Sequence, residues 1–103
     1  MVVRTWRGAT RAADADAYAE YIDETGIAAL AGTPGNRGVQ MWQRVEGDRA
    51  EFVVVSWWES REAIVAFAGD DIERAVFYPE DDRYLVERGE TVVHYDVVRE
   101  SRA

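Results

Sequence analysis

The hydrophobic positions along the chain repeat with two different periods, and each period predicts a kind of element. Residues Val2 to Ala9 alternate in steps of two, which is typical of a strand. Tyr18, Tyr21, Ile22 and Thr25 then recur at spacings of three and four, so they share one face of a helix. The chain therefore begins with a strand followed by an amphipathic helix.

Residues with known terminal preferences set the expected ends of this helix. Asp14 and Asp16 place negative charge at its start, where the helix dipole favours it. Gly26 predicts its C-terminal cap. Residues 27–31 are expected to form a further short turn, and the sequence Gly-Thr-Pro-Gly-Asn at 32–36 predicts a bend or reversal.

Two runs rich in β-branched and aromatic residues predict an antiparallel hairpin from Gly38 to Val45 and from Ala50 to Trp58. Gly47 stands at the first central position of the intervening turn, which favours a type II′ turn. That turn fixes the register. It pairs Arg44 with Glu51, Gln43 with Phe52, Trp42 with Val53 and Met41 with Val54.

Helix signals dominate the next segment. Ser60 is expected to cap a helix from Arg61 to Ala68, which Gly69 ends. A short helical stretch should open at Asp70 and Asp71, and a further helix should begin at Pro79 and stop at Gly89. The segment from Thr91 to Val98 is predicted to form the last strand. This order predicts one α+β domain over residues 1–103, a ferredoxin-like βαββαβ fold with a four-stranded antiparallel sheet.

The apolar positions of the predicted hairpin also predict a partner. Right-handed crossovers place all helices of this fold on one face of the sheet. The strand from Ala50 to Trp58 is nevertheless apolar on both faces, with Phe52, Val54 and Trp58 on one and Val53, Val55 and Trp57 on the other. A bare apolar face of this size predicts a homodimer that packs through its sheet faces. The alternative is that the additional aromatics lie at a sheet edge beneath the helices.

Composition excludes several classes of function. The chain of 103 residues has a net charge of −8, and its acidic residues are scattered, so neither nucleic acid nor an anionic membrane surface is an expected partner. It contains no cysteine for a thiol nucleophile or thiolate metal site, and its basic residues are all arginine, so no lysine can form a Schiff base. With no apolar run of about 20 residues and no signal peptide pattern, the expected location is the cytoplasm.

Several motifs resemble one known family. These are Thr33-Pro34-Gly35-Asn36-Arg37-Gly38, Trp57-Trp58-Glu59-Ser60-Arg61-Glu62-Ala63, Tyr78-Pro79-Glu80-Asp81 and Val93-His94-Tyr95-Asp96-Val97. Together they resemble the antibiotic biosynthesis monooxygenase family of dimeric α+β barrels over nearly the whole chain. The resemblance implies either a cofactor-independent oxygenase of aromatic compounds, in which the ionised substrate itself reduces oxygen, or a haem-degrading enzyme.

The haem branch of the family places an asparagine, a tryptophan and a histidine at positions that here correspond to Arg4 or Thr5, to Phe67, and to Phe77 or Tyr78. The only histidine, His94, lies on the last predicted strand. The iron ligand that the resemblance implies is therefore missing, and no cofactor is expected. No metal is expected either, because the acidic stretches at 70–71 and 80–82 lie at predicted helix starts.

Three residues are candidates for catalysis. His94 has an imidazole that can act as a base near neutral pH, or it can be a hydrogen-bonded structural residue. Arg4 shares a strand face with Trp6 and lies beside the strand of His94, so it can steady an anion, or it can pair with a surface acid. Tyr78 carries a phenol that can donate to a substrate oxygen.

Five aromatic residues are candidates for the walls of a substrate pocket, or alternatively for ordinary core: Trp6, Trp58, Phe67, Phe77 and Tyr84. With the resemblance, they favour a cofactor-independent monooxygenase that acts on a small aromatic or phenolic ligand. The alternative function is a non-catalytic protein that binds a small ligand, or serves in an interaction, on the same dimeric scaffold.

Overall fold

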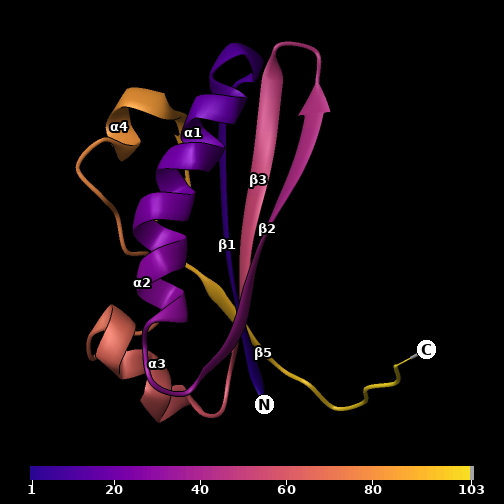
Figure 1. Ribbon diagram of the computed structural model, residues 1–103, viewed down its shortest axis with the longest axis vertical. Helices are drawn as coiled ribbons and strands as arrows, with labels where there is room; N and C mark the ends of the chain where they lie inside the picture. The colour runs from indigo at the N-terminus through magenta and orange to yellow at the C-terminus, as the bar shows by residue number, and fades with distance from the viewer. Residues whose placement is uncertain (103) are drawn as a thin grey trace.

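The computed structural model, which describes residues 1–102, has one antiparallel sheet with the helices on one side of it (Figure 1). The long strands are β1 (Val2–Arg11), β2 (Asn36–Glu46) and β3 (Arg49–Trp58). The short strands β4 (Leu85–Arg88) and β5 (Val93–Asp96) both pair with β1, β4 near its end and β5 near its beginning. The sheet order β2-β3-β1-β4 is that of a ferredoxin-like fold, so the predicted fold class is confirmed.

The hairpin of β2 and β3 has the predicted register. Arg44 lies opposite Glu51, and the two side chains form an ion pair of 2.8 Å. Gly47 has a φ of +59°, whereas no other residue type in residues 1–102 has a positive φ. Of the two central residues of this turn, Gly47 has a positive φ and Asp48 does not, which fits the predicted type II′ turn.

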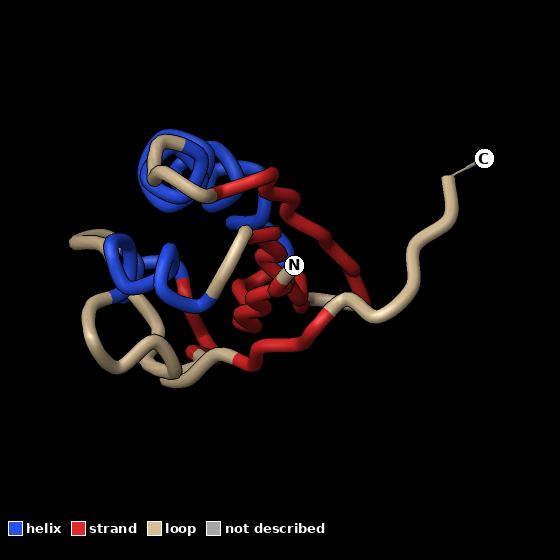
Figure 2. The backbone as a smooth tube through the Cα atoms, turned by 90° about the horizontal axis from the view of Figure 1, so that it is seen from below, coloured by secondary structure: helices blue, strands red, loops and turns tan. Residues whose placement is uncertain are grey.

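The helical segments follow β1 and β3. A 3₁₀ turn (Ala12–Asp14) leads into α1 (Ala15–Ile22), a π-helical turn (Asp23–Ile27) and α2 (Ala28–Ala31) without a break. The other two helices are α3 (Arg61–Ala68) and α4 (Asp81–Tyr84). No helix in residues 1–102 is long and apolar enough to cross a membrane. Figure 2, which looks along the strands, shows the helices gathered beside the sheet and the C-terminal tail leaving on the far side.

The predicted end of the first helix is wrong. Gly26 does not cap it, because the helical segment continues through Gly26 to Ala31. A Cβ atom at position 26 would meet Tyr78 Cε2 at 3.4 Å, so this glycine allows close approach of another segment. The cap of α3 is as predicted, since Ser60 Oγ accepts from the backbone N–H of Ala63 and Gly69 follows with a φ of +85°.

Two predictions for residues 70–89 are also wrong. No helix opens at Asp70 and Asp71, where the chain turns toward the Arg74–Thr91 bridge. The helix expected up to Gly89 is a single turn, α4, because Leu85–Arg88 pair with β1 instead. Tertiary strand pairing thus overrides the local helix signals. The fourth position of the predicted four-stranded sheet is accordingly shared by two short strands, β4 and β5.

The core between helices and sheet has two parts. One buried cluster contains Ala15, Tyr18, Ile22, Ala50 and Phe52, and the other contains Val2, Leu30, Trp58 and Ile64. Val54, in the middle of β3, packs against both clusters. Side chains from β1, β3, all four helices and the segment before α4 meet between the helices and the sheet, beside these two clusters.

Candidate functional site

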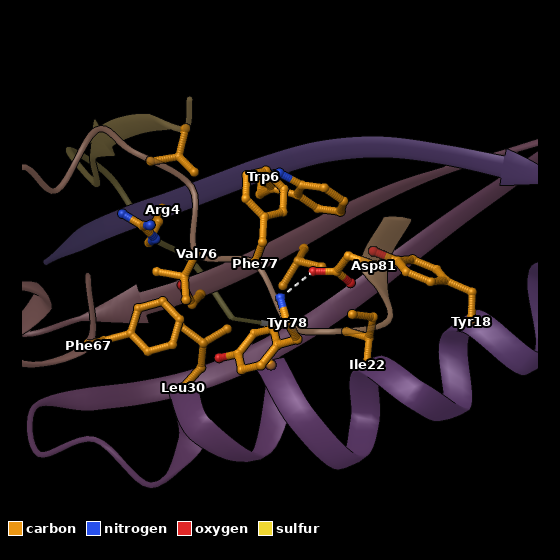
Figure 3. A pocket seen from close by; sticks show the side chains of 14 residues that line it. Arg4, Trp6, Tyr18, Ile22, Leu30, Phe67, Val76, Phe77, Tyr78 and Asp81 are labelled. Atoms are coloured by element: carbon orange, nitrogen blue, oxygen red, sulfur yellow. Dashed lines mark hydrogen bonds between the residues drawn. The ribbon is translucent and has the colours of Figure 1, made fainter. Parts of the chain in front are cut away.

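A small cavity lies between the helices and the sheet, and its lining draws on both core clusters (Figure 3). Its volume is about 60 Å³. That is room for a few water molecules, so a ring-sized ligand requires its walls to part. The residues that line it are Arg4, Trp6, Tyr18, Ile22, Gly26, Leu30, Val54, Ser56, Phe67, Val76, Phe77, Tyr78, Asp81 and Val92.

Arg4 brings a positive charge into this apolar cavity. Its side chain extends from β1 toward the helices, and the residue is only 4% exposed. Nη1 donates to the carbonyl oxygen of Ile72 at 2.5 Å and lies 3.1 Å from His94 Nε2, while Nη2 donates to the carbonyl oxygen of Arg74 at 3.1 Å. The guanidinium carbon also lies 5.6 Å from the centre of the Phe67 ring. These contacts fix the guanidinium at one end of the cavity.

No carboxylate in residues 1–102 pairs with Arg4, so the predicted alternative of an ion pair with a surface acid is wrong. Burial lowers the pKa of Arg4 to about 10, which leaves the guanidinium charged at neutral pH. Three of its five N–H groups have partners, and all three partners are neutral acceptors. A buried cation without a counter-ion is unfavourable in a folded protein, and it forms a ready binding site for an anion.

His94 lies behind Arg4, outside the cavity lining. The antiparallel register of β1 and β5 puts His94 directly opposite Arg4. Burial, together with the positive charges of Arg4 and Arg61, lowers the pKa of His94. The imidazole is therefore neutral at pH 7, and a neutral Nε2 that faces a guanidinium N–H accepts its hydrogen bond.

An aromatic wall lines the cavity beyond Arg4. Trp6 Nε1 donates to the carbonyl oxygen of Gly89 at 2.7 Å, which fixes the indole. Phe77 meets Trp6 edge to face, with ring centres 6.5 Å apart, and Arg88 stacks on Phe77 at 3.7 Å. Flat apolar walls of this kind accept a planar aromatic ligand.

Tyr78 and Asp81 complete the lining at the start of α4. Burial, then the charge of Asp81, raises the pKa of the Tyr78 phenol, so this hydroxyl stays protonated and can donate. Figure 3 shows the Tyr78 hydroxyl directed toward the side of the cavity where Leu30 and Phe67 lie. Asp81 is 3% exposed, and burial is the main cause of its raised pKa.

Two of the residues proposed from the sequence as pocket walls stand one layer back. Trp58 is fully buried and contacts the lining through Phe67, at 6.3 Å between ring centres. Tyr84 contacts it through Tyr18, at 5.8 Å. The other three, Trp6, Phe67 and Phe77, line the cavity together with Arg4 and Tyr78.

Asp81 was missed by the sequence reasoning. An acidic residue in the first turn of a helix is normally explained by the helix dipole, which hides any second role. Tyr18 was also missed, because it belongs to the apolar face of the first helix. The signal available in the sequence for Asp81 was the family motif Tyr78-Pro79-Glu80-Asp81, and no such signal was available for Tyr18.

Comparisons with solved structures and with protein families agree with this fold. A variant of MhuD with two manganese protoporphyrin IX molecules per active site is 27% identical over 100% of both chains, with a TM-score of 0.62. The haem degrader MhuD from Mycobacterium tuberculosis with two haems bound is 25% identical over 99% of this chain and 100% of that one, with a TM-score of 0.60. HapK from Hahella chejuensis shares the fold at 12% identity over 100% and 98% of the chains, with a TM-score of 0.65.

Among curated protein sequences, none shows significant similarity to this chain. The family model described as antibiotic biosynthesis monooxygenase matches residues 1–76, which include Arg4, Trp6 and Phe67 of the cavity. The chain belongs to the antibiotic biosynthesis monooxygenase family.

Proposed function

We propose that the protein is a cofactor-independent monooxygenase of a small, single-ring phenolic or other aromatic compound. The observation that carries this proposal is the buried guanidinium of Arg4, which has no acidic partner in residues 1–102 and faces an aromatic-walled cavity. Such a site stabilises the anion of a phenol or enol more than its neutral form. An electron-rich anion is the form of such a compound that reacts directly with oxygen.

The overall reaction balances without any added cofactor. A hydroquinone and O₂ give a hydroxyquinone and water, so one oxygen atom enters the ring and the other leaves as water. The substrate anion passes one electron to O₂, and the resulting radical and superoxide join through a new C–O bond. Loss of water from that hydroperoxide leaves the new carbonyl. All four electrons come from the substrate.

Each candidate residue has a role in this scheme. Arg4 holds the negative charge, and Tyr78 donates a hydrogen bond from a phenol that stays protonated. His94 acts as a positioning residue that accepts a hydrogen bond from Arg4. Trp6, Phe67 and Phe77 enclose the ring and exclude water, while Trp58 and Tyr84 support that lining from behind.

The residues present do not fit haem as the reacting group. Histidine, cysteine and methionine are all missing from the described lining of the cavity, and His94 turns its Nε2 to Arg4. Burial raises the pKa of Tyr78 and of Tyr18, which disfavours the phenolates that would be needed to ligate iron. We derive no step through haem for this chain, although MhuD shares its fold.

We also propose a homodimer through the bare sheet face. Alternate residues of β5, β1, β3 and β2 point away from the helices, and they include the exposed Trp42, Val93 and Tyr95. Val3, Val53 and Trp57 lie between them on the same face. A second copy packed face to face covers this surface in a self-complementary way.

Oxygen consumption tests the activity. The full-length protein is supplied with a panel of hydroquinones, catechols and anthrones in metal-chelated buffer without flavin or nicotinamide. We expect uptake with at least one single-ring substrate and the appearance of one labelled oxygen atom in the product from ¹⁸O₂. Binding of these compounds without uptake would instead identify a non-catalytic binding protein.

A further inference from the structure

Asp81 is a buried acid that the roles given above leave without a function. It is 3% exposed and lines the cavity. Its Oδ2 accepts from the backbone N–H of Tyr78 at 2.6 Å, but its Oδ1 is buried without a hydrogen-bond partner in the described residues. Buried carboxylate oxygens are normally satisfied, so the second oxygen requires an explanation.

A structural role accounts for one of the two oxygens. The backbone N–H of Asp81 donates to the carbonyl oxygen of Tyr78 at 3.0 Å, and Oδ2 accepts a hydrogen bond from the backbone N–H of Tyr78. This reciprocal pair closes the turn from Tyr78 to Asp81 before α4. An asparagine would close the same turn without burying a charge. Closing this turn therefore does not require a carboxylate.

The surroundings of Asp81 increase its affinity for a proton. Burial raises its pKa, and the negative charge of Asp82 acts in the same direction. The hydrogen bond from Tyr78 and the positive charge of Arg88 lower it, and each of these is weaker than burial but stronger than the charge of Asp82. Tyr18 on the facing helical segment is a neutral phenol near neutral pH, because burial and then the charge of Asp81 raise its pKa.

Arg4 and Asp81 lie at different ends of the cavity. Arg4 contacts Phe67, which packs on the cluster around Trp58, whereas Asp81 lies beside Tyr18 of the other cluster. Figure 3 shows the two charged side chains on either side of Phe77. A planar ring between them would present one end to a cation and the opposite end to a proton acceptor.

We propose that Asp81 is the catalytic base, which takes the proton from the substrate at the end of the cavity opposite Arg4. This inference rests on the proposed function and narrows the substrate class. The acidic O–H or C–H and the oxygen that receives the charge must lie at opposite ends of one conjugated ring, as in a phenol with a carbonyl group in the para position. Catalysis by such a base commonly contributes about 10²-fold or more to the rate.

The proton transfer balances within the cavity. The O–H or C–H bond of the substrate breaks, an O–H bond forms at Asp81 Oδ1, and the electron pair stays on the substrate. Conjugation moves the negative charge across the ring to the oxygen beside Arg4. The net charge of the site does not change, so binding and ionisation release no proton to the solvent.

The probe 4-nitrophenol has this geometry, and its ionised form is coloured. Full-length protein is titrated with the probe at a pH below the pKa of the free phenol, and colour reports ionisation. Calorimetry in two buffers with different heats of ionisation counts the protons released. The variant is Asp81→Asn, which keeps an oxygen for Tyr78, and the matched control is Asp82→Asn, a neighbouring carboxylate that is 82% exposed. Asp81→Ser provides a second variant that retains an acceptor for the turn.

We expect the wild type and Asp82→Asn to bind the probe as its coloured anion with no net proton release. The Asp81 variants should bind it uncoloured, or should release about one proton for each anion that forms. Wild type and Asp81 variants that both give the coloured anion and the same release of one proton would overturn the role of Asp81 and leave the Arg4 site standing. A wild type that never binds the coloured anion would overturn the anion site and, with it, this inference.

Discussion

The two faces of the sheet differ in the kind of side chain that lies in an unfavourable environment: a charged side chain is buried on one face, and apolar side chains are exposed on the other. On the helix side, a positive charge is buried, since Arg4 is 4% exposed and has neutral partners only. On the opposite side, large apolar side chains are exposed, with Trp42 at 51%, Val93 at 52% and Tyr95 at 56%. Both arrangements are unfavourable for an isolated chain.

This difference indicates what each face binds. A buried cation is stabilised by an anion, so the helix side is the face that we propose for a small ligand and its chemistry. An exposed apolar surface is stabilised by another apolar surface, so the bare side is the face that we propose for assembly. The predictions below test whether the two roles are separable.

The largest effect is expected from Arg4→Met, which keeps an aliphatic stem and removes the charge. Loss of a preorganised anion-stabilising group should lower the oxygen uptake rate by a factor of about 10²–10³. The carbonyl groups of Ile72 and Arg74 lose their donor, at a cost of about 1–3 kcal/mol, and the removal of the unpaired buried charge offsets part of this loss of stability. Sedimentation should still give a dimer. An Arg4→Met protein that keeps its activity would contradict the proposal that the buried charge of Arg4 makes the helix side the ligand-binding face.

The bare face is tested by Val93→Glu. A carboxylate buried without a partner at the interface should weaken dimerisation by a factor of about 100, measured by sedimentation equilibrium. The matched control is Val45→Glu, because Val45 is also 52% exposed but lies opposite Ala50, on the helix-side face of the hairpin. If both variants dissociate equally, or neither does, the bare face is not the interface.

A smaller effect is expected from His94→Leu, which removes the acceptor behind Arg4. Activity should fall about tenfold, because a hydrogen bond to a charged group is lost. His94→Gln offers an amide oxygen in its place and should recover most of that loss. If the activity of His94→Gln is as low as that of His94→Leu, His94 has a role other than positioning Arg4.

His94 also sets a pH dependence. Its pKa is lowered in the fold, so the unfolded chain binds the proton first as the pH falls below about 6.5. Stability is therefore fully present above that pH and decreases below it, until the folded protein also takes up the proton. The thermal midpoint of the wild type should fall more between pH 7.5 and 5.5 than that of His94→Gln. Equal falls would contradict the lowered pKa.

The smallest effect is expected from Gly26→Ala, which adds one methyl group to the cavity wall 3.4 Å from Tyr78. Alanine should favour the helical segment by up to about 1 kcal/mol. The narrower cavity should weaken binding of a phenolic probe about threefold, a loss of well under 1.4 kcal/mol. Dimerisation should not change. An unchanged affinity would place the ligand elsewhere.

The sequence predicts the hairpin and α3 well because their signals are local. One glycine turn fixes the register that pairs Arg44 with Glu51, and Ser60 with Gly69 brackets a helix of the predicted length. For residues 85–88 the sequence predicts a helix, because acidic residues precede them and Arg88 stands near the end. Their pairing with β1 depends on contacts about 75 positions away, which no local pattern contains.

The difference between local signals and long-range contacts also decides which features of the site the sequence predicts. Strand alternation was enough to put Arg4 and Trp6 on one face and His94 beside them. It could not show that Arg4 is buried without a counter-ion, because that depends on the carbonyl groups of the irregular segment after α3. Nor could it show that one oxygen of Asp81 has no partner, since this is a property of the folded packing.

The anion site at Arg4 is tested most directly by the acidity of a bound phenol. The visible absorbance of 4-nitrophenol is recorded against pH when it is free, when it is bound to the wild type and when it is bound to Arg4→Met. We predict that the wild type lowers the pH at which the bound probe ionises and that Arg4→Met abolishes this shift. An unchanged or raised ionisation pH on the wild-type protein would contradict the proposal that the buried guanidinium is an anion site.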